Sequence, residues 1–121
     1  MAAEIAGLPT SSMTAADSGL PIACNLEAFS APERERHASL LQRLDGRILE
    51  RREVSEGYAF RFAMEADTIA ELAEWICLER RCCPFLRFSI EVDPDGGPVW
   101  LTLAGSAQVK AFIGSTFHTL R

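Results

Sequence analysis

Residues 86–103 read LRFSIEVDPDGGPVWLTL. Its first seven residues alternate apolar and polar side chains, which is the period of a β-strand with one buried face. A turn sequence rich in proline, aspartate and glycine follows at 94–97, and a second apolar alternation runs over 99–103. The stretch therefore predicts a β-hairpin.

A second pair of strands is predicted upstream of this hairpin. Residues 58–64 alternate aromatic or apolar side chains with small and charged ones, which favours a two-faced strand. Residues 48–54 form a weaker, more highly charged strand, and the turn sequence 55–57 separates the two. The chain therefore carries two consecutive strand pairs.

Helices are predicted before, between and after the strand pairs. Ser30 and Glu33 have the spacing of a capping box, while Asp67 and Ser106 are suitable N-cap residues for two later helices. The apolar spacing of the second helix is helical. Its predicted buried stripe consists of Ile69, Leu72, Ala73 and Ile76.

The predicted fold class is α+β, with the element order (β)αββαββα. The bracketed element is a short apolar segment at 20–26, read as an edge strand or an extended lead-in. Adjacent strand pairs with helices between them favour an antiparallel sheet of four to five strands, with helices packed on one face. We expect residues 1–20 to be a disordered tail and residues 21–121 to form a single domain.

Composition and charge exclude several classes of protein. The chain has 121 residues, of which 48% are hydrophobic, so it can build a core without disulfide cross-links. Its formal net charge of −5 does not favour binding to nucleic acid or to anionic membranes. The N-terminal stretch lacks the basic region of a secretory signal, so we expect a cytoplasmic protein with reduced thiols.

The chemically distinctive motif is the run ERRCCPF at residues 79–85. Pro84 disfavours helical geometry at Cys83, so the second helix should end close to Cys82. The Cα atoms of adjacent residues are about 3.8 Å apart, below the usual disulfide range, so these two cysteines are not expected to bond to each other. They can offer two thiols to a soft metal or metalloid, or to a third cysteine such as Cys24.

The predicted metal site comprises Cys24, Cys82 and Cys83, with Glu79 as a fourth donor. A vicinal pair with one distant cysteine does not match the spacing of structural zinc sites, and three sulfur donors suit a softer ion. The alternative for Glu79 is an ion pair with an arginine on the helix surface.

The remaining cysteine and the two histidines are expected to have structural roles. Cys77 lies five residues before the first cysteine of the pair and points away from it, so it is assigned to packing. His37 falls on the buried stripe of the first helix and is interpreted as a core residue with a partner. His118 is expected to be solvated.

Recognised enzyme motifs are missing. The sequence contains no G-x-G-x-x-G, P-loop, H-E-x-x-H, G-x-S-x-G or C-x-x-C pattern, which favours a protein without catalytic activity.

From Cys24 onward the chain resembles a group of small, largely uncharacterised bacterial proteins. The resemblance rests on the early cysteine in residues 21–24 and on the motif at 79–85 as it enters a strand. It implies a shared fold and a cysteine site, and it carries no activity with it.

Three functions are compatible with these patterns. The chain is a soft-metal or metalloid binder, a thiol-redox protein in which Cys24 resolves a disulfide with Cys82 or Cys83, or a non-catalytic interaction module with structural cysteines. In the last case the open sheet face, including Trp100, meets a protein partner or a second copy of the chain.

Overall fold

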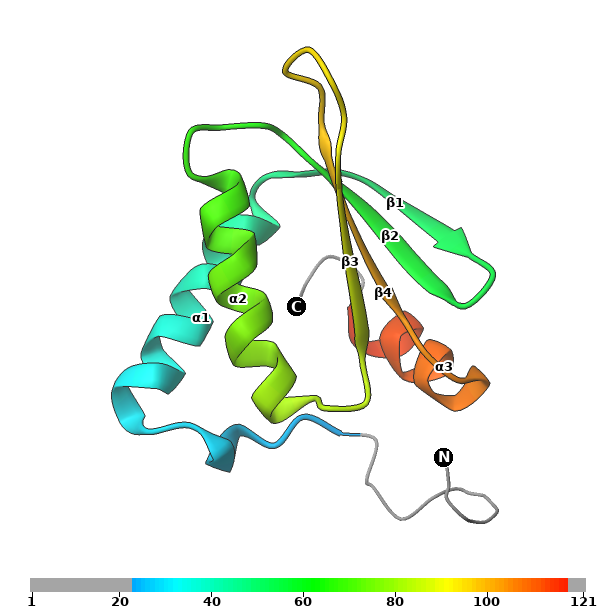
Figure 1. Cartoon of the computed structure of the whole chain (residues 1–121). Helices are drawn as coiled ribbons and strands as arrows, with labels where there is room; N and C mark the ends of the chain where they lie inside the picture. Colours follow the sequence, from blue (N-terminus) through cyan, green and yellow to red (C-terminus); the bar gives the residue numbers. More distant parts are fainter. Residues whose placement is uncertain (1–22, 118–121) are drawn as a thin grey trace.

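The structure, a computed structural model, describes residues 23–117 and contains two helix-strand-strand units followed by a closing helix (Figure 1). The order of helices and strands along the chain is the predicted one. The elements are the single 3₁₀ turn η1 (Leu26–Ala28), α1 (Ala31–Asp45), β1 (Ile48–Val54), β2 (Gly57–Phe62), α2 (Thr68–Cys82), β3 (Arg87–Val92), β4 (Val99–Ala104) and α3 (Ala107–Thr116).

Two predictions concern parts of the chain outside the described range. The expected tail at 1–20 lies there, and so does His118. Within residues 23–117, no helix has the length and apolar character needed to cross a membrane.

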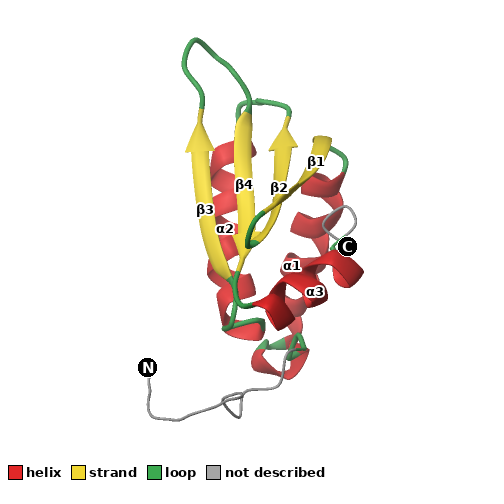
Figure 2. Ribbon diagram, turned by 90° about the vertical axis from the view of Figure 1, so that its right-hand side faces the viewer, coloured by secondary structure: helices red, strands yellow, loops and turns green. Residues whose placement is uncertain are grey.

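The four strands form one antiparallel sheet in the order β1-β2-β4-β3 (Figure 2). The register places Phe60 opposite Leu101 and Phe88 opposite Leu103, so apolar side chains from three strands share one face. This arrangement confirms the predicted α+β class. The optional fifth strand is absent from the described part of its segment, because residues 23–26 pair with no strand and lead instead into η1.

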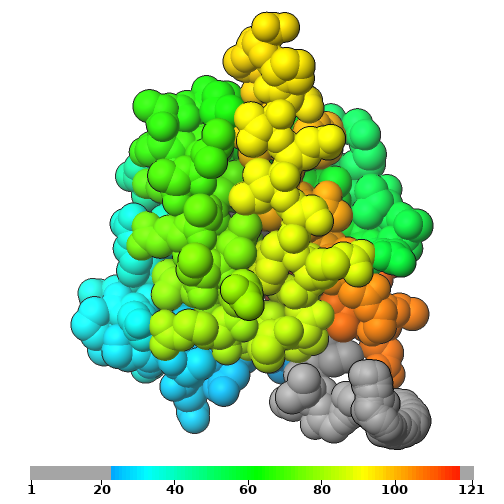
Figure 3. Space-filling view, viewed as in Figure 1, coloured from blue at the N-terminus to red at the C-terminus, as the bar shows by residue number. Residues whose placement is uncertain are grey.

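The helices lie on the apolar face of the sheet. Helices α1 and α2 run side by side (Figure 1), and the gap that the ribbons leave between α2 and β3 is filled by side chains (Figure 3). Helix α3 packs on β2, where Gly114 lies against the ring of Tyr58. On the opposite face of the sheet, Cζ of Arg52 lies 4.6 Å from the ring centroid of Trp100. None of the described helices covers this tryptophan (Figure 2).

Two of the three predicted helix caps form as expected. Ser30 and Glu33 make both hydrogen bonds of a capping box, and Ser106 accepts a hydrogen bond from the backbone of α3. Asp67 occupies the N-cap position of α2 but makes no capping bond. Its carboxylate instead forms an ion pair with Arg43 at 2.9 Å, which joins the start of α2 to α1.

Helix α2 is rotated relative to the stripe predicted from its apolar residues. Leu72 is buried as expected, but Ile69 is 41% exposed, Ala73 is exposed and Ile76 is only half-buried. The rotation buries Trp75, whose ring makes edge-to-face contacts with phenylalanines at 88 and 117, and an indole buries more apolar area than an isoleucine. The buried residues of α2 are Thr68, Glu71, Leu72, Trp75, Glu79 and Cys82.

The tight approach of β2 to β4 generates the first prediction. A Cβ atom at Gly57 would overlap the carbonyl oxygen of Leu103 and lie 2.8 Å from the Cα of Ala104. Because both neighbours are backbone atoms, they can move only with the strand, and we expect Gly57→Ala to lower the free energy of unfolding by about 2 to 3 kcal/mol in urea denaturation.

Gly46→Ala is the matched control. Gly46 has a helical backbone with φ of −68°, and its added Cβ would meet no atom closer than 3.6 Å. We expect this substitution to leave stability unchanged or to raise it by about 0.5 kcal/mol. Equal losses in both variants would contradict the strand packing described above.

Candidate functional site

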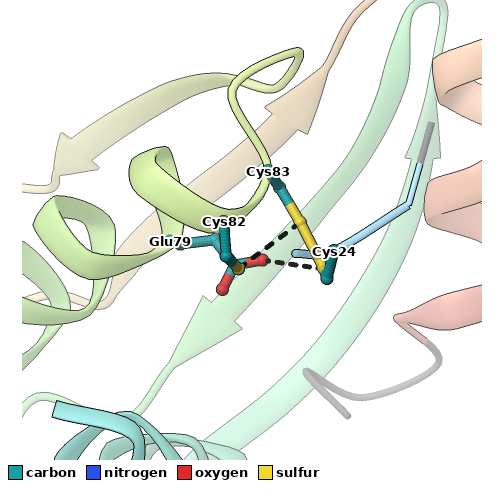
Figure 4. A group of neighbouring side chains, drawn as sticks. All are labelled: Cys24, Glu79, Cys82 and Cys83. Carbon is teal, nitrogen blue, oxygen red and sulfur yellow. Dashed lines mark hydrogen bonds between the residues drawn. A yellow bond between two sulfur atoms is a disulfide. The ribbon is translucent and has the colours of Figure 1, made fainter. Parts of the chain in front are cut away.

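Four side chains converge at the C-terminal end of α2 (Figure 4). They are the four predicted from the sequence, Cys24, Glu79, Cys82 and Cys83, and one ligand atom from each lies within 4.8 Å of all the others. Cys82 and Cys83 are fully buried and Glu79 is 1% exposed, whereas Cys24 is accessible to solvent. The cluster is therefore buried on its helix side and open on the side of the N-terminal segment.

The end of α2 brings the two adjacent sulfurs into the same cluster. The helix ends at Cys82, as predicted, and the N–H of Cys83 still donates to the carbonyl of Glu79 at 2.7 Å. Pro84 then excludes further helical geometry, and the backbone of Cys83 turns to φ −128° and ψ 71°. The sulfurs of Cys82 and Cys83 lie 3.7 Å apart and, as predicted, are not bonded to each other.

The N-terminal segment is held against this helix end by hydrogen bonds. The N–H of Asn25 donates to the carbonyl of Cys82 at 2.9 Å, and the guanidinium of Arg81 donates to a backbone carbonyl of η1 at 2.8 Å. The same guanidinium lies 5.3 Å from the ring centroid of Phe29, which is buried. These contacts place Cys24 beside residues that follow it by more than fifty positions in the sequence.

Cys24 and Cys83 are joined by a disulfide, with their Cα atoms 4.9 Å apart. This separation lies within the range usual for disulfides. Cys82 keeps a free thiol, which is fully buried beside the disulfide. The site thus holds three sulfurs, two of which form the oxidised pair in this structure.

Glu79 is buried and pairs with a histidine. Nε2 of His37 lies at hydrogen-bond distance, 2.7 Å, from Oε1 of Glu79, and the other carboxylate oxygen lies 3.6 Å from the sulfur of Cys24. His37 is 6% exposed, in agreement with the prediction of a core residue with a partner. The alternative prediction, a surface pair between Glu79 and an arginine, is wrong, because the rotation of α2 turns Glu79 inward.

His37 is the residue that the sequence did not connect with the cysteines. It lies 42 positions from Glu79 and belongs to a different helix. A signal was present in the spacing, since Glu79 is four residues after Trp75 and seven after Leu72, and so shares a helix face with both. With Trp75 taken as the centre of the buried face, Glu79 would have been predicted as a core carboxylate in need of a partner.

Burial raises the pKa of the Cys82 thiol from its usual 9.0 to about 12. The negative charge of Glu79 and a hydrogen bond to its carboxylate add to the rise, and the backbone of Asn25 acts in the opposite direction. A neighbouring carboxylate opposes formation of a thiolate because two negative charges then share a poorly solvated site. Cys82 therefore stays protonated at neutral pH.

Cys77 does not belong to the site and does not pack in the core. The sequence prediction that it points away from Cys82 agrees with the structure, but the assignment to packing is wrong, because Cys77 is exposed. The reason is again the rotation of α2. Cys77 and Ala73 both lie on the solvent-exposed face of α2, away from Cys82.

Comparison with protein-family models finds no match, and the searches of curated proteins and of solved structures find none either. The fold and the cluster define an α+β protein with an open four-stranded sheet and a three-sulfur, one-carboxylate site. The resemblance to small bacterial proteins stays a prediction. Any function must therefore be argued from the geometry of the site itself.

The second prediction follows from the environment of Cys82. Thiolate absorbance near 240 nm is compared between the oxidised Cys77→Ser protein and the oxidised Cys77→Ser, Cys82→Ser protein. At pH 10 about nine-tenths of an ordinary thiol is ionised, but we expect only about one-hundredth of the Cys82 thiol to be ionised.

The same shift makes stability depend on pH. The unfolded chain releases the Cys82 proton near pH 9 while the folded chain retains it, so the free energy of unfolding should fall as the pH rises from 9 toward 12. Half-ionisation near pH 9 in the folded protein would contradict this description of the site.

Proposed function

We propose that the reduced chain binds one soft metal or metalloid ion through the sulfurs of Cys24, Cys82 and Cys83, with Glu79 beside them. The observation that carries this proposal is the convergence of the four donor atoms within 4.8 Å. Thiolates are soft ligands and select thiophilic ions, whereas carboxylate and carbonyl oxygens suit harder ones. Three sulfurs in one cluster therefore favour a thiophilic ion.

The spacing of the two adjacent sulfurs supports a shared ion. Two sulfurs each about 2.3 Å from one tetrahedral centre are about 3.8 Å apart. The sulfurs of Cys82 and Cys83 are separated by 3.7 Å, so they match this distance without a change in the helix end. Cys24 lies on the accessible side, where an ion would arrive from solvent.

The disulfide between Cys24 and Cys83 is interpreted as the oxidised form of the same site. A two-electron reduction by a dithiol converts it into two thiols, which together with Cys82 complete the sulfur donor set. In the reducing compartment expected from the sequence, these thiols would be the resting form.

The disulfide also supports a second candidate function, that of a thiol-redox protein. Cys24 and Cys83 would cycle between dithiol and disulfide, the pairing that the redox alternative requires. The environment of Cys82 argues against a role for this thiol as the attacking group, since thiolate formation is opposed there. This objection does not apply to Cys83. Ion binding is preferred because the sulfur of Cys82 and the carboxylate of Glu79 converge with the disulfide pair, which a two-cysteine couple does not require.

The third prediction tests ion binding. The protein is reduced anaerobically and titrated with Cd²⁺ and, separately, with arsenite, and native mass spectrometry gives the stoichiometry. We expect at least one of these probes to bind one to one. Binding should weaken at least tenfold in the Cys82→Ser, Cys83→Ser double variant, because two of the three soft donors are lost.

Cys77→Ser is the matched control, since this thiol lies on the same helix but is exposed and outside the cluster. It should bind like the unaltered protein. The proposal fails if neither probe binds, or if the double variant binds as well as the control. In that case a structural disulfide, as in the interaction-module alternative, becomes the better description.

A further inference from the structure

We propose that the ion is a trivalent metalloid, delivered as a neutral hydroxide of the arsenite type, and that it is held by the sulfurs of Cys24, Cys82 and Cys83 without Glu79. This inference rests on the proposed function and specifies its substrate class. It follows from the number of donors that are free to bind, from the burial of the site and from the charge that each kind of ion would leave there.

Glu79 already has partners for its carboxylate. Oε1 accepts the 2.7 Å hydrogen bond from His37, and this contact is buried on both sides. Oε2 lies 3.6 Å from the sulfur of Cys24, at the distance of a thiol hydrogen bond once the disulfide is reduced. The donors without a competing strong partner are the three sulfurs. A trivalent metalloid takes three ligands and carries a lone pair in the fourth position, whereas Zn²⁺ in structural sites takes four.

The charge of the filled site distinguishes the two classes of ion. A dication with three thiolates carries one net negative charge, in addition to that of Glu79, where Cys82, Cys83 and Glu79 are almost entirely buried. A trivalent metalloid with three thiolates is neutral and adds no charge to the Glu79–His37 pair. Burying uncompensated charge is strongly unfavourable, so the neutral product is preferred at this place in the fold.

Two arginines that contact the N-terminal segment beside the cluster donate to other groups. Arg81 donates to the carboxylate of Glu33 and to a backbone carbonyl of η1, and Arg34 donates to the carbonyl of Phe29. Within residues 23–117, no lysine or arginine side chain donates a hydrogen bond to the cluster sulfurs or to Glu79. An excess of negative charge at the site therefore has no arginine or lysine to offset it.

The exchange is balanced in atoms and charge. A dithiol reductant first supplies two electrons and two protons to the Cys24–Cys83 disulfide, giving two thiols and an oxidised dithiol. Three metalloid–oxygen bonds then break and three metalloid–sulfur bonds form. Each thiol proton leaves with a hydroxide as water, so three waters are released and the metalloid keeps its oxidation state. Cys24, the accessible sulfur, is the first that a neutral hydroxide meets from solvent.

The fourth prediction compares ion classes in a Cys77→Ser background, which removes the exposed thiol outside the cluster. Isothermal titration of the reduced protein should show one arsenite bound, at least tenfold more tightly than Cd²⁺. Single Cys24→Ser, Cys82→Ser and Cys83→Ser variants should each lose at least tenfold in arsenite affinity. Glu79→Gln should change arsenite affinity by less than threefold.

The outcomes separate this inference from the function on which it rests. Cysteine-dependent binding of Cd²⁺ that is as tight as that of arsenite, or tighter, keeps the ion site and overturns the metalloid assignment. A loss of tenfold or more for arsenite in a folded Glu79→Gln variant overturns the three-sulfur coordination. Far-UV circular dichroism shows whether the Glu79→Gln variant is folded. If it is not folded, the comparison of arsenite with Cd²⁺ on the Cys77→Ser protein, which keeps Glu79, still tests the metalloid assignment. Absence of binding by both probes overturns the ion site itself.

Discussion

The burial of the Glu79 carboxylate links the core of the protein to the candidate site. A carboxylate that is 1% exposed needs a partner, and the imidazole of His37 lies 2.7 Å away on α1. This contact and the burial of Trp75 together set the phase of α2, that is, its rotation about its own axis relative to α1. The same phase turns Cys82 inward, leaves Cys77 in solvent and sets the carboxylate beside the sulfurs. The core and the candidate site are therefore built by one helix face.

The site also depends on how its two chain segments are held together. Hydrogen bonds from Asn25 and Arg81 hold the N-terminal segment on the end of α2 without help from the sulfurs. A cluster held by its backbone can exchange a disulfide for an ion with small movements of Cys24 and Cys83. Under the proposed function, the disulfide and the bound ion would be alternative states of one group of atoms, and oxidation would exclude the ion because it consumes two of the proposed ligands.

Most of the fold was predictable from local patterns, because strand alternation and helix caps are properties of neighbouring residues. The hairpin at 86–103, the capping box at Ser30 and the helix end before Pro84 all formed as expected. The phase of α2 was not predictable in this way. Its outward isoleucine at position 69 and inward glutamate at position 79 are settled by packing against other elements, and hydrophobicity alone assigns both to the wrong face.

The same distinction between local patterns and tertiary packing applies to the candidate site. Its four residues were identifiable from their chemistry and from the unusual motif. The pairings within it were not, because the disulfide joins Cys24 to a residue 59 positions later and Glu79 contacts a histidine 42 positions earlier. Such pairings are determined by the tertiary fold, and one sequence contains no spacing that specifies them.

The proposed coordination of one trivalent metalloid by three sulfurs of this chain can be observed directly. X-ray absorption at the arsenic edge of the reduced, arsenite-loaded Cys77→Ser protein counts the atoms bound to the metalloid directly. We expect three sulfur neighbours and no oxygen or nitrogen neighbour. A spectrum with two sulfurs and an oxygen, or with oxygen neighbours alone, would contradict it.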